Sequence, residues 1–258
     1  MLISRALRLE RGSVVSFVGA GGKTSAMFRL AQELKTAGWR VVATTTTHIS
    51  ENQVSLAPAW LPADQLNSLS ARLSEYGHCL ITGAPDGHGR VRGVSPDTVA
   101  ELHARPDVDA VLVEADGSRL RSFKAPAEHE PAVPPTTTHL VPVMGIDVIG
   151  QPLDDDHVHR PERVAALTGL KPGDPVTVDA AALVLVAPDG GAKQRPAHAQ
   201  LKLLINKVDN EAALGFARAV AERLVKHSAV DAVLLGCMQG EMPVREVWSP
   251  IAGIILES

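Results

Sequence analysis

The chain has 258 residues, of which 45% are hydrophobic and 21% charged, and its formal net charge is −4. This composition is typical of a globular protein, and the length suits one large α/β domain whose core needs no disulfide or metal. With a small negative charge, four Phe, three Trp and one Tyr, the sequence argues against a nucleic-acid partner, whose binding needs clustered cations or stacked aromatic rings.

The sequence also indicates the compartment. Cys79 and Cys237 lie far apart and form no CxxC pair, which fits a reducing environment. The N-terminal stretch MLISRALRLERGS is too charged for a signal peptide, and no apolar run reaches the roughly 18 residues of a membrane span. We therefore expect a cytoplasmic protein without a membrane partner, and the sequence leaves its oligomeric state open.

Strand and helix patterns alternate through the first half of the chain. Residues 14–18 form a continuous apolar run that predicts a strand buried on both faces, and residues 24–35 have helical spacing before a stop at Gly38. The elements expected next are a strand over 40–48, a helix over 63–76, a strand over 78–83, a hairpin or exposed loop over 84–94, a helix over 95–105 and a strand over 108–117. Ser95 is the expected N-cap of the last helix, with Pro96 at its first position.

The second half begins with a proline-rich stretch, residues 121–139, which predicts a long loop or extended connection. The elements expected after it are a strand over 140–150, a helix from Pro161 to a stop at Gly169, a helix or strand within 179–196, a strand over 201–209, a helix over 210–227 and a last strand over 231–237. This alternation predicts a three-layer α/β fold with a mainly parallel central sheet. We expect one domain over 1–258 with a proline-rich insertion around 120–175.

A glycine loop with the sequence GAGGKTS joins the first strand to the first helix. Glycines let backbone amides converge on phosphate oxygens, and the helix N-terminus adds partial positive charge. The usual P-loop pattern, GxxxxGK[ST], has a glycine where this chain has Phe17, so the loop is a short variant. Lys23 is expected to reach the β- and γ-phosphates and Thr24 to ligate Mg²⁺. The predicted phosphate contacts are Gly19, Gly21, Gly22, Lys23, Thr24 and Ser25.

A second motif, NKVD, ends the stretch 201–209, directly after its apolar run. In GTPases an NKxD motif reads guanine, because the Asp carboxylate accepts hydrogen bonds from N1–H and the exocyclic amine. Here Asp209 would take that role, Lys207 would lie along the ring and Asn206 would brace the loop. The alternative is that Asp209 is an ordinary helix N-cap. The sequence therefore favours GTP and leaves ATP open.

Acidic and hydroxyl side chains follow two other strands. Glu114 and Asp116 are two residues apart on an extended chain, so both point to one side, where a carboxylate can hold Mg²⁺. The run TTTTH ends the strand over 40–48; one Thr is a candidate metal ligand, and the alternative is β-propensity alone. His48 is a candidate for orienting water or substrate, and Lys23 and Asp116 are the other candidate catalytic residues.

Two further loops carry candidate side chains. His157 and His159 are two residues apart in DDDHVHRPE, but an acidic loop in which an Asp or His caps the helix at Pro161 is the favoured interpretation over a metal site. Lys124 and Lys193 lie in proline- and glycine-containing loops. They could bind an anionic substrate or be solvated surface lysines.

Taken in order, GAGGKTS, TTTTH, VEADGSR with KAPAEHEP, HRPE, the GG.K..P loop and NKVD resemble the YqeC family, accessory proteins of selenium-dependent molybdenum hydroxylases. The resemblance covers almost the whole chain and implies a P-loop nucleotide-binding protein that helps mature a molybdenum or selenium cofactor. It also implies a client molybdenum hydroxylase or cofactor-assembly protein as partner. The short GxGGKT loop is similar to the ATP loop of Mur ligases as well.

Three hypotheses about function follow from these motifs. The first is a maturation factor that binds and hydrolyses a nucleotide, GTP with Mg²⁺, through Lys23, Thr24 and one of the two carboxylates at Glu114 and Asp116. The second is an ATP-dependent kinase or ligase that acts on a small cofactor precursor. The third is a nucleotide-sensing module without catalysis.

Overall fold

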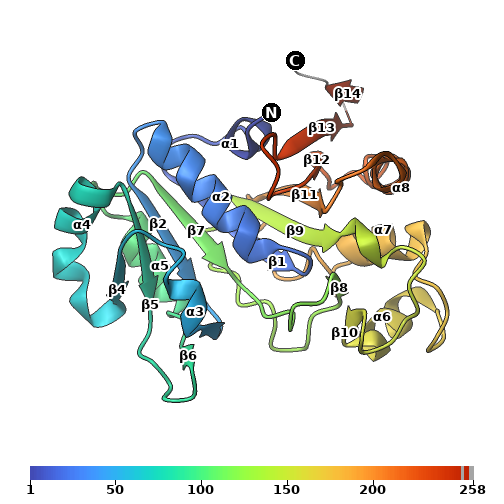
Figure 1. Ribbon diagram of the computed structural model, residues 1–258, viewed down its shortest axis with the longest axis horizontal. Coiled ribbons are helices and arrows are strands. Elements are labelled where there is room, and N and C mark those ends of the chain that lie inside the picture. Colours follow the sequence, from blue (N-terminus) through green and yellow to red (C-terminus); the bar gives the residue numbers. More distant parts are fainter. Residues whose placement is uncertain (251–252, 256–258) are drawn as a thin grey trace.

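The computed structural model describes residues 1–250 and 253–255, and its main feature is one ten-stranded sheet (Figure 1). The strands lie in the order β14 (Gly253–Ile255), β13 (Val244–Ser249), β12 (Ala232–Gly236), β11 (Gln200–Asn206), β9 (His139–Gly145), β1 (Ser13–Gly19), β7 (Ala110–Glu114), β2 (Val41–Thr45), β5 (His78–Thr82) and β4 (Trp60–Pro62). All neighbours pair in parallel except β12–β13 and β13–β14. The predicted mainly parallel α/β sheet is thus confirmed.

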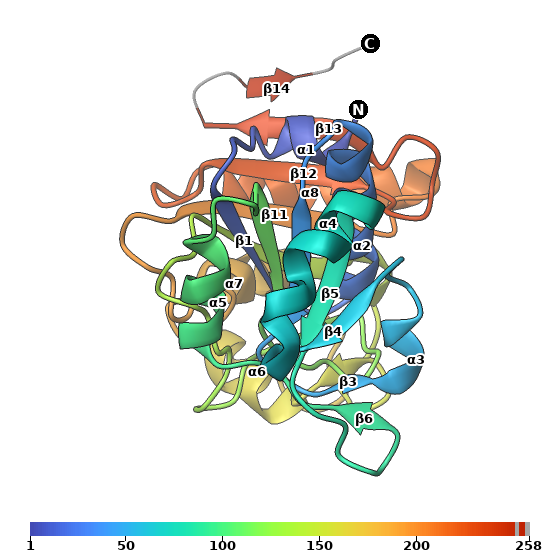
Figure 2. The same ribbon diagram turned by 90° about the vertical axis from the view of Figure 1, so that its left-hand side faces the viewer.

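Helices cover both faces of this sheet, as Figures 1 and 2 show. The helices are α1 (Ile3–Ala6), α2 (Lys23–Thr36), α3 (Glu51–Val54), α4 (Leu69–Tyr76), α5 (Pro96–His103), α6 (Pro161–Thr168), α7 (Val178–Val186) and α8 (Glu211–Leu224), with 3-10 turns η1 (Ala63–Ser68) and η2 (Ile146–Val148). Buried side chains form two clusters. One cluster contains side chains of α1 and α2 together with Val15 and Phe17 of β1. The other contains side chains of α4, α5, α6, α7 and α8 together with Val14 and Val18 of β1. The alternating side chains of β1 therefore contact both helical layers, as its apolar run predicts.

Several local predictions are corrected by the structure. The helix expected over 63–76 is broken into η1 and α4, with a non-helical backbone at Gln65. The undecided segment within 179–196 begins with helix α7. The strand expected to be last is followed by β13 and β14, and α1 was not foreseen. These pieces are short, and their structure depends on neighbours distant in sequence, so local pattern alone does not reveal them.

The carboxyl ends of β2, β7, β1, β9 and β11 meet at one edge because these strands are parallel. Short elements lie at this edge in the lower half of Figure 1. They are α3, β3 (Ile49–Ser50) paired with β6 (Arg90–Val91), and β8 (Phe123–Lys124) paired with β10 (Val158–His159) beside α6. Residues 120–175, expected to be an insertion, contain β9 in the centre of the sheet as well as β8, β10 and α6. Ligands of open α/β sheets bind at such an edge.

None of the helices in residues 1–250 and 253–255 combines the length and the hydrophobicity that a membrane span requires.

Candidate functional site

The glycine loop lies between β1 and α2, as the sequence predicts. Gly21 has φ +82°, and a Cβ there would lie 2.1 Å from the backbone nitrogen of Gly145 at the end of β9. Gly22 has φ +122°, and its Cβ would lie 2.2 Å from Nδ2 of Asn206. Both the left-handed backbone and the close approach of neighbouring strands exclude a side chain at these positions.

The first turn of α2 presents free backbone donors. The Gly22, Lys23, Thr24 and Ser25 amides have no hydrogen-bond acceptor within residues 1–250 and 253–255, and α2 has no side-chain cap. Unsatisfied amides at a helix N-terminus form an anion-binding site, because the dipole and the N–H groups both favour negative charge. Gly21 is different, since its amide donates to the carbonyl of Arg121 at 2.9 Å.

Lys23 is buried within this loop. Its Nζ donates to the carbonyl of Gly19 at 2.6 Å and lies 3.2 Å from Oδ1 of Asp116 and 3.8 Å from Oε1 of Glu114. The two carboxylates therefore point to the same side of the chain, as their spacing predicts. Lysine ammonium groups bind carboxylate and phosphate oxygens alike, so phosphate oxygens are chemically possible partners of this cation.

Thr24 and Glu114 provide oxygen ligands side by side. The Thr24 hydroxyl donates to Oε2 of Glu114 at 2.7 Å, and Nε2 of Gln53 donates to the same hydroxyl at 3.1 Å. Burial raises the pKa of the Glu114 carboxyl, against the positive charge of Lys23. Hydroxyl and carboxylate oxygens are hard ligands of the kind that Mg²⁺ uses together with substrate phosphates. The contact from Gln53 was not foreseen, because nothing in its local sequence marks it.

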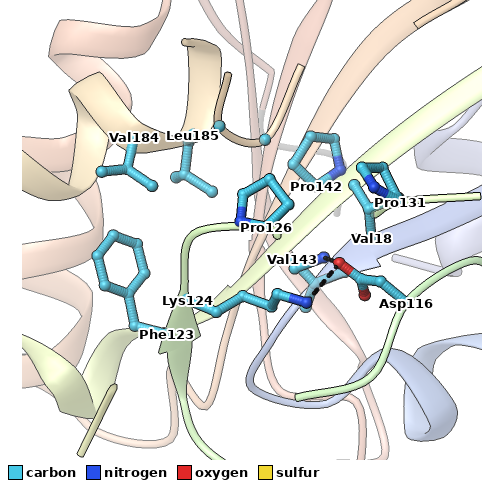
Figure 3. Close-up of a pocket in the computed structure, with 13 residues that line it drawn as sticks. Val18, Asp116, Phe123, Lys124, Pro126, Pro131, Pro142, Val143, Val184 and Leu185 are labelled. Atoms are coloured by element: carbon cyan, nitrogen blue, oxygen red, sulfur yellow. Dashed lines mark hydrogen bonds and ion pairs between the residues drawn. The ribbon is translucent and has the colours of Figure 1, made fainter. Parts of the chain in front are cut away.

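Asp116 is held by more partners than the sequence indicates. Its Oδ2 accepts from the amide of Gly19 at 3.0 Å and lies 3.0 Å from Nζ of Lys124. Figure 3 shows the Lys124 side chain extended from β8 toward the carboxylate of Asp116. Lys124 is buried, so the interpretation as a solvated surface lysine is wrong.

The ion pairs continue beyond Lys124. Its Nζ donates to Oε2 of Glu130 at 2.8 Å, and Arg160 contacts both oxygens of the same carboxylate, at 2.6 and 3.2 Å. Burial raises the pKa of the Glu130 carboxyl, but the hydrogen bonds and charges of Arg160 and Lys124 outweigh it and lower the pKa to about 2. Charges thus alternate from the glycine loop to the segment before α6. Sequence reasoning missed Glu130 and Arg160, because only the fold brings them together.

Asn206 connects three elements of the site. Its Nδ2 donates to the carbonyl of Gly21 at 2.8 Å, and its Oδ1 accepts from the amide of Met238, which follows β12, at 3.0 Å. The side chain is buried, and both its nitrogen and its oxygen are hydrogen-bonded, so the end of β11 is fixed to the glycine loop. This is the bracing contact that the NKVD motif predicts for its Asn.

Lys207 and Asp209 complete that motif at the surface. Lys207 has φ +64°, and its Nζ donates to the hydroxyl of Ser122 at 2.7 Å and to Oδ2 of Asp147 at 2.8 Å. Asp209 is exposed and accepts a hydrogen bond from its neighbour Asn210. The N-cap of α8 is Asn210, whose side chain accepts from the amide of Ala213. The alternative role of Asp209 as that N-cap is therefore wrong.

The threonine run and His48 lie at and directly after the carboxyl end of β2. Thr45 donates to the carbonyl of Glu114 at 3.0 Å, and Thr46 donates to the carbonyl of Ala132 at 2.8 Å, so both hydroxyls bind backbone. His48 is exposed and lines a cavity of about 530 Å³ together with Thr24 and Glu114. The hydroxyl near the carboxylates is therefore that of Thr24 rather than one from the run.

The remaining candidates do not form a metal site. Within the part of the chain that the structure describes, no group of three or more His, Cys, Asp or Glu side chains is arranged to hold a metal ion. His157 hydrogen-bonds with Asp154 at 2.7 Å, whereas His159 lies in the cavity beside Thr24. The N-cap of α6 is Arg160, without a side-chain cap, so the expected Asp or His cap is wrong. Lys193 donates to two backbone carbonyls of the proline-rich segment, at 2.7 and 2.9 Å.

Comparison with known proteins adds a family to this geometry. Residues 15–162 match the model of a family described as "YqeC protein". The chain is also similar to the "Uncharacterized protein YqeC" of Escherichia coli (strain K12), with 34% identity over 236 residues, 89% of each chain.

Similar solved structures include two FtsY chains, from Physcomitrella patens (chloroplast) and Mycoplasma mycoides. Their identities are 15% and 9%, and their TM-scores are 0.33 and 0.37. The alignments cover 98% and 100% of this chain, which spans 64% and 68% of those chains. At this similarity the family assignment depends on the sequence matches, and by those matches the chain belongs to the YqeC family.

Proposed function

We propose that this protein binds and hydrolyses a nucleoside triphosphate with Mg²⁺ at the glycine loop. The observation that supports it is the free amides of Gly22–Ser25 next to Lys23, with the oxygens of Thr24 and Glu114 2.7 Å apart. The amides would hold the phosphates, and Lys23 would leave Asp116 to stabilise charge on the terminal phosphate. Thr24 and Glu114 would hold Mg²⁺, which neutralises phosphate charge when bound. Asp116, which contacts Lys23, Lys124 and the amide of Gly19, would hold Lys23 beside the loop until a nucleotide binds.

We propose GTP as the nucleotide. Asn206 hydrogen-bonds to the glycine loop, as expected for the Asn of an NKxD motif. Asp209 does not cap α8, so its carboxylate is available to guanine. Lys207 borders a second cavity, of about 420 Å³, on the side of the sheet edge where β9 and β11 end. A nucleoside in that cavity would extend its phosphates toward α2.

The role in the cell follows from family resemblance. We propose that nucleotide turnover serves the maturation of a selenium-dependent molybdenum hydroxylase or its cofactor, in the cytoplasm, with the client enzyme or a cofactor-assembly protein as partner. A second candidate is phosphoryl or nucleotidyl transfer to a small cofactor precursor. The cavity of about 530 Å³ beside Thr24 and Glu114 favours it, because a hydrolase that uses only water does not need this space.

Calorimetric titration with non-hydrolysable GTP and ATP analogues, in Mg²⁺, tests the nucleotide assignment. We expect a clear preference for the GTP analogue. Asp209→Asn should weaken GTP binding about 10- to 100-fold, because a hydrogen bond to a charged group contributes about 1.5–3 kcal/mol. Asp64→Asn, a change at another exposed aspartate, is the control. Equal affinity of the Asp209→Asn variant and the parent would refute guanine recognition.

Lys23→Ala tests the phosphate loop itself. We expect nucleotide binding to be lost, while Asp116 keeps Lys124 and the amide of Gly19 as partners and the fold is retained, as circular dichroism would show. Lys226→Ala, at an exposed lysine that follows α8, is the control. Unchanged binding in Lys23→Ala would end the phosphate-loop interpretation.

A further inference from the structure

The cavity of about 530 Å³ next to the phosphate loop has the size of a small-molecule site. Its walls come from five further parts of the chain: His48 with β3 and α3, residue 90 of β6, residues 117–120, Glu130, and residues 159–160. Thr24 and Glu114 form one side of it. A ligand in this cavity would therefore lie next to the terminal phosphate of a nucleotide held by the loop.

Two unpaired guanidinium groups line this cavity. Arg90 and Arg119 make no side-chain hydrogen bond or ion pair with any described residue, whereas the third arginine, Arg160, is paired with Glu130. Glu114 accepts a hydrogen bond from Thr24 and faces Lys23. The cavity is thus lined by three arginines but by only two carboxylates, those of Glu114 and Glu130. Guanidinium forks match the oxygens of phosphate and carboxylate groups.

The backbone holds Arg119 in an uncommon conformation. Arg119 and Leu120 have φ of +47° and +63°, values that cost a residue with a side chain about 1 kcal/mol or more. The next residue, Arg121, accepts a hydrogen bond from the amide of Gly21 in the glycine loop. The glycine loop thus helps to fix the segment that carries Arg119.

This segment also separates the cavity from the space proposed for the nucleoside. Leu120 is 96% exposed and borders both the cavity with Arg119 and the cavity of about 420 Å³ with Lys207. A nucleotide with its base near Lys207 would reach α2 with its phosphates and leave the arginine-lined cavity open to another molecule. His159 also lines this cavity; burial and the charges of Arg160 and Lys124 lower its pKa to about 4, so a neutral imidazole is available for hydrogen bonding.

We propose that this cavity binds a second ligand, an organic phosphate ester, with its phosphate between Arg90 and Arg119 and next to the terminal phosphate of the nucleotide. The position relative to a nucleotide rests on the proposed function. The preference for a phosphate ester rests on the two unpaired guanidinium groups and the size of the cavity.

Phenyl phosphate is a suitable probe, because it combines one phosphate with a small body that the cavity can enclose. It would be titrated calorimetrically into the free protein and into protein saturated with Mg²⁺ and the non-hydrolysable GTP analogue. The variants are the double substitution Arg90→Ala/Arg119→Ala and, as a matched control, Arg92→Ala. Arg92 is an exposed arginine of the same hairpin that does not line the cavity.

We expect the parent and Arg92→Ala to bind phenyl phosphate in both forms, and the double variant to lose at least tenfold in affinity while it binds the GTP analogue like the parent. The proposal is overturned if the parent does not bind the probe at millimolar concentration, or if the double variant binds it unchanged. It is also overturned if the double variant loses nucleotide affinity instead, because the arginines would then serve the nucleotide. If no nucleotide binds but probe binding to the free protein depends on both arginines, the proposed function fails and the cavity assignment stands.

Discussion

Glu130→Gln removes the carboxylate that joins Lys124 to Arg160. The carboxyl is largely buried and accepts from both cations, at 2.8 and 2.6 Å for the shortest contacts. Its pKa falls from an ordinary 4.5 to about 2 in the folded protein. At about 1.36 kcal/mol for each pH unit, that difference stabilises the fold by about 3 kcal/mol at pH 7. We therefore expect Glu130→Gln to lose about 2–3 kcal/mol of unfolding free energy.

The pH dependence of the stability loss distinguishes the loss of this ion pair from a loss of side-chain packing, which would not vary with pH. The folded-state pKa lies below the unfolded value, so the stabilisation is complete well above pH 4.5 and is lost as the pH falls toward 2. Urea unfolding of the parent and of Glu130→Gln would be followed by circular dichroism at pH 7, 5.5, 4 and 3. The difference in unfolding free energy between the two proteins should narrow below pH 4.5.

A control lies two residues away. The Glu128 side chain is 93% exposed, and its contact with Arg163, at 3.6 Å, is a surface ion pair. Surface ion pairs contribute little, so Glu128→Gln should change the free energy of unfolding by less than about 0.5 kcal/mol. A gap for Glu130→Gln below about 0.5 kcal/mol at pH 7, or one that stays constant down to pH 3, would refute the reasoning.

Two further predictions concern the glycine loop. Gly21→Ala places a Cβ 2.1 Å from the nitrogen of Gly145 at φ +82°, so we expect a loss of about 3 kcal/mol in urea unfolding, and a loss under about 1 kcal/mol would contradict the strained close approach. Thr24→Ala should weaken nucleotide binding in Mg²⁺ at least tenfold but have little effect in EDTA, because the hydroxyl acts through the metal. Equal weakening with and without Mg²⁺ in the calorimeter would assign Thr24 to the phosphate instead.

The sequence by itself determined those features of this protein that depend on residues next to one another in the chain. The apolar run of β1, the glycines with Lys23 and Thr24, and the start of α2 follow from residues adjacent in the chain. Parallel strands then bring their polar ends to one edge, so the proximity of Glu114 and Asp116 to Lys23 could be predicted as well.

Only the tertiary structure decided which distant groups meet. Lys124 lies in the short strand β8, Glu130 follows in the proline-rich segment, and Arg160 comes directly after β10. The motifs that contain these residues do not reveal that Lys124 joins Asp116 to Glu130 or that Arg160 pairs with Glu130. The pairing of Arg160 with Glu130 also leaves Arg90 and Arg119 as the unpaired cations of the cavity. Ion pairs depend on distances between residues far apart in the chain, and a sequence pattern reports only its own neighbours.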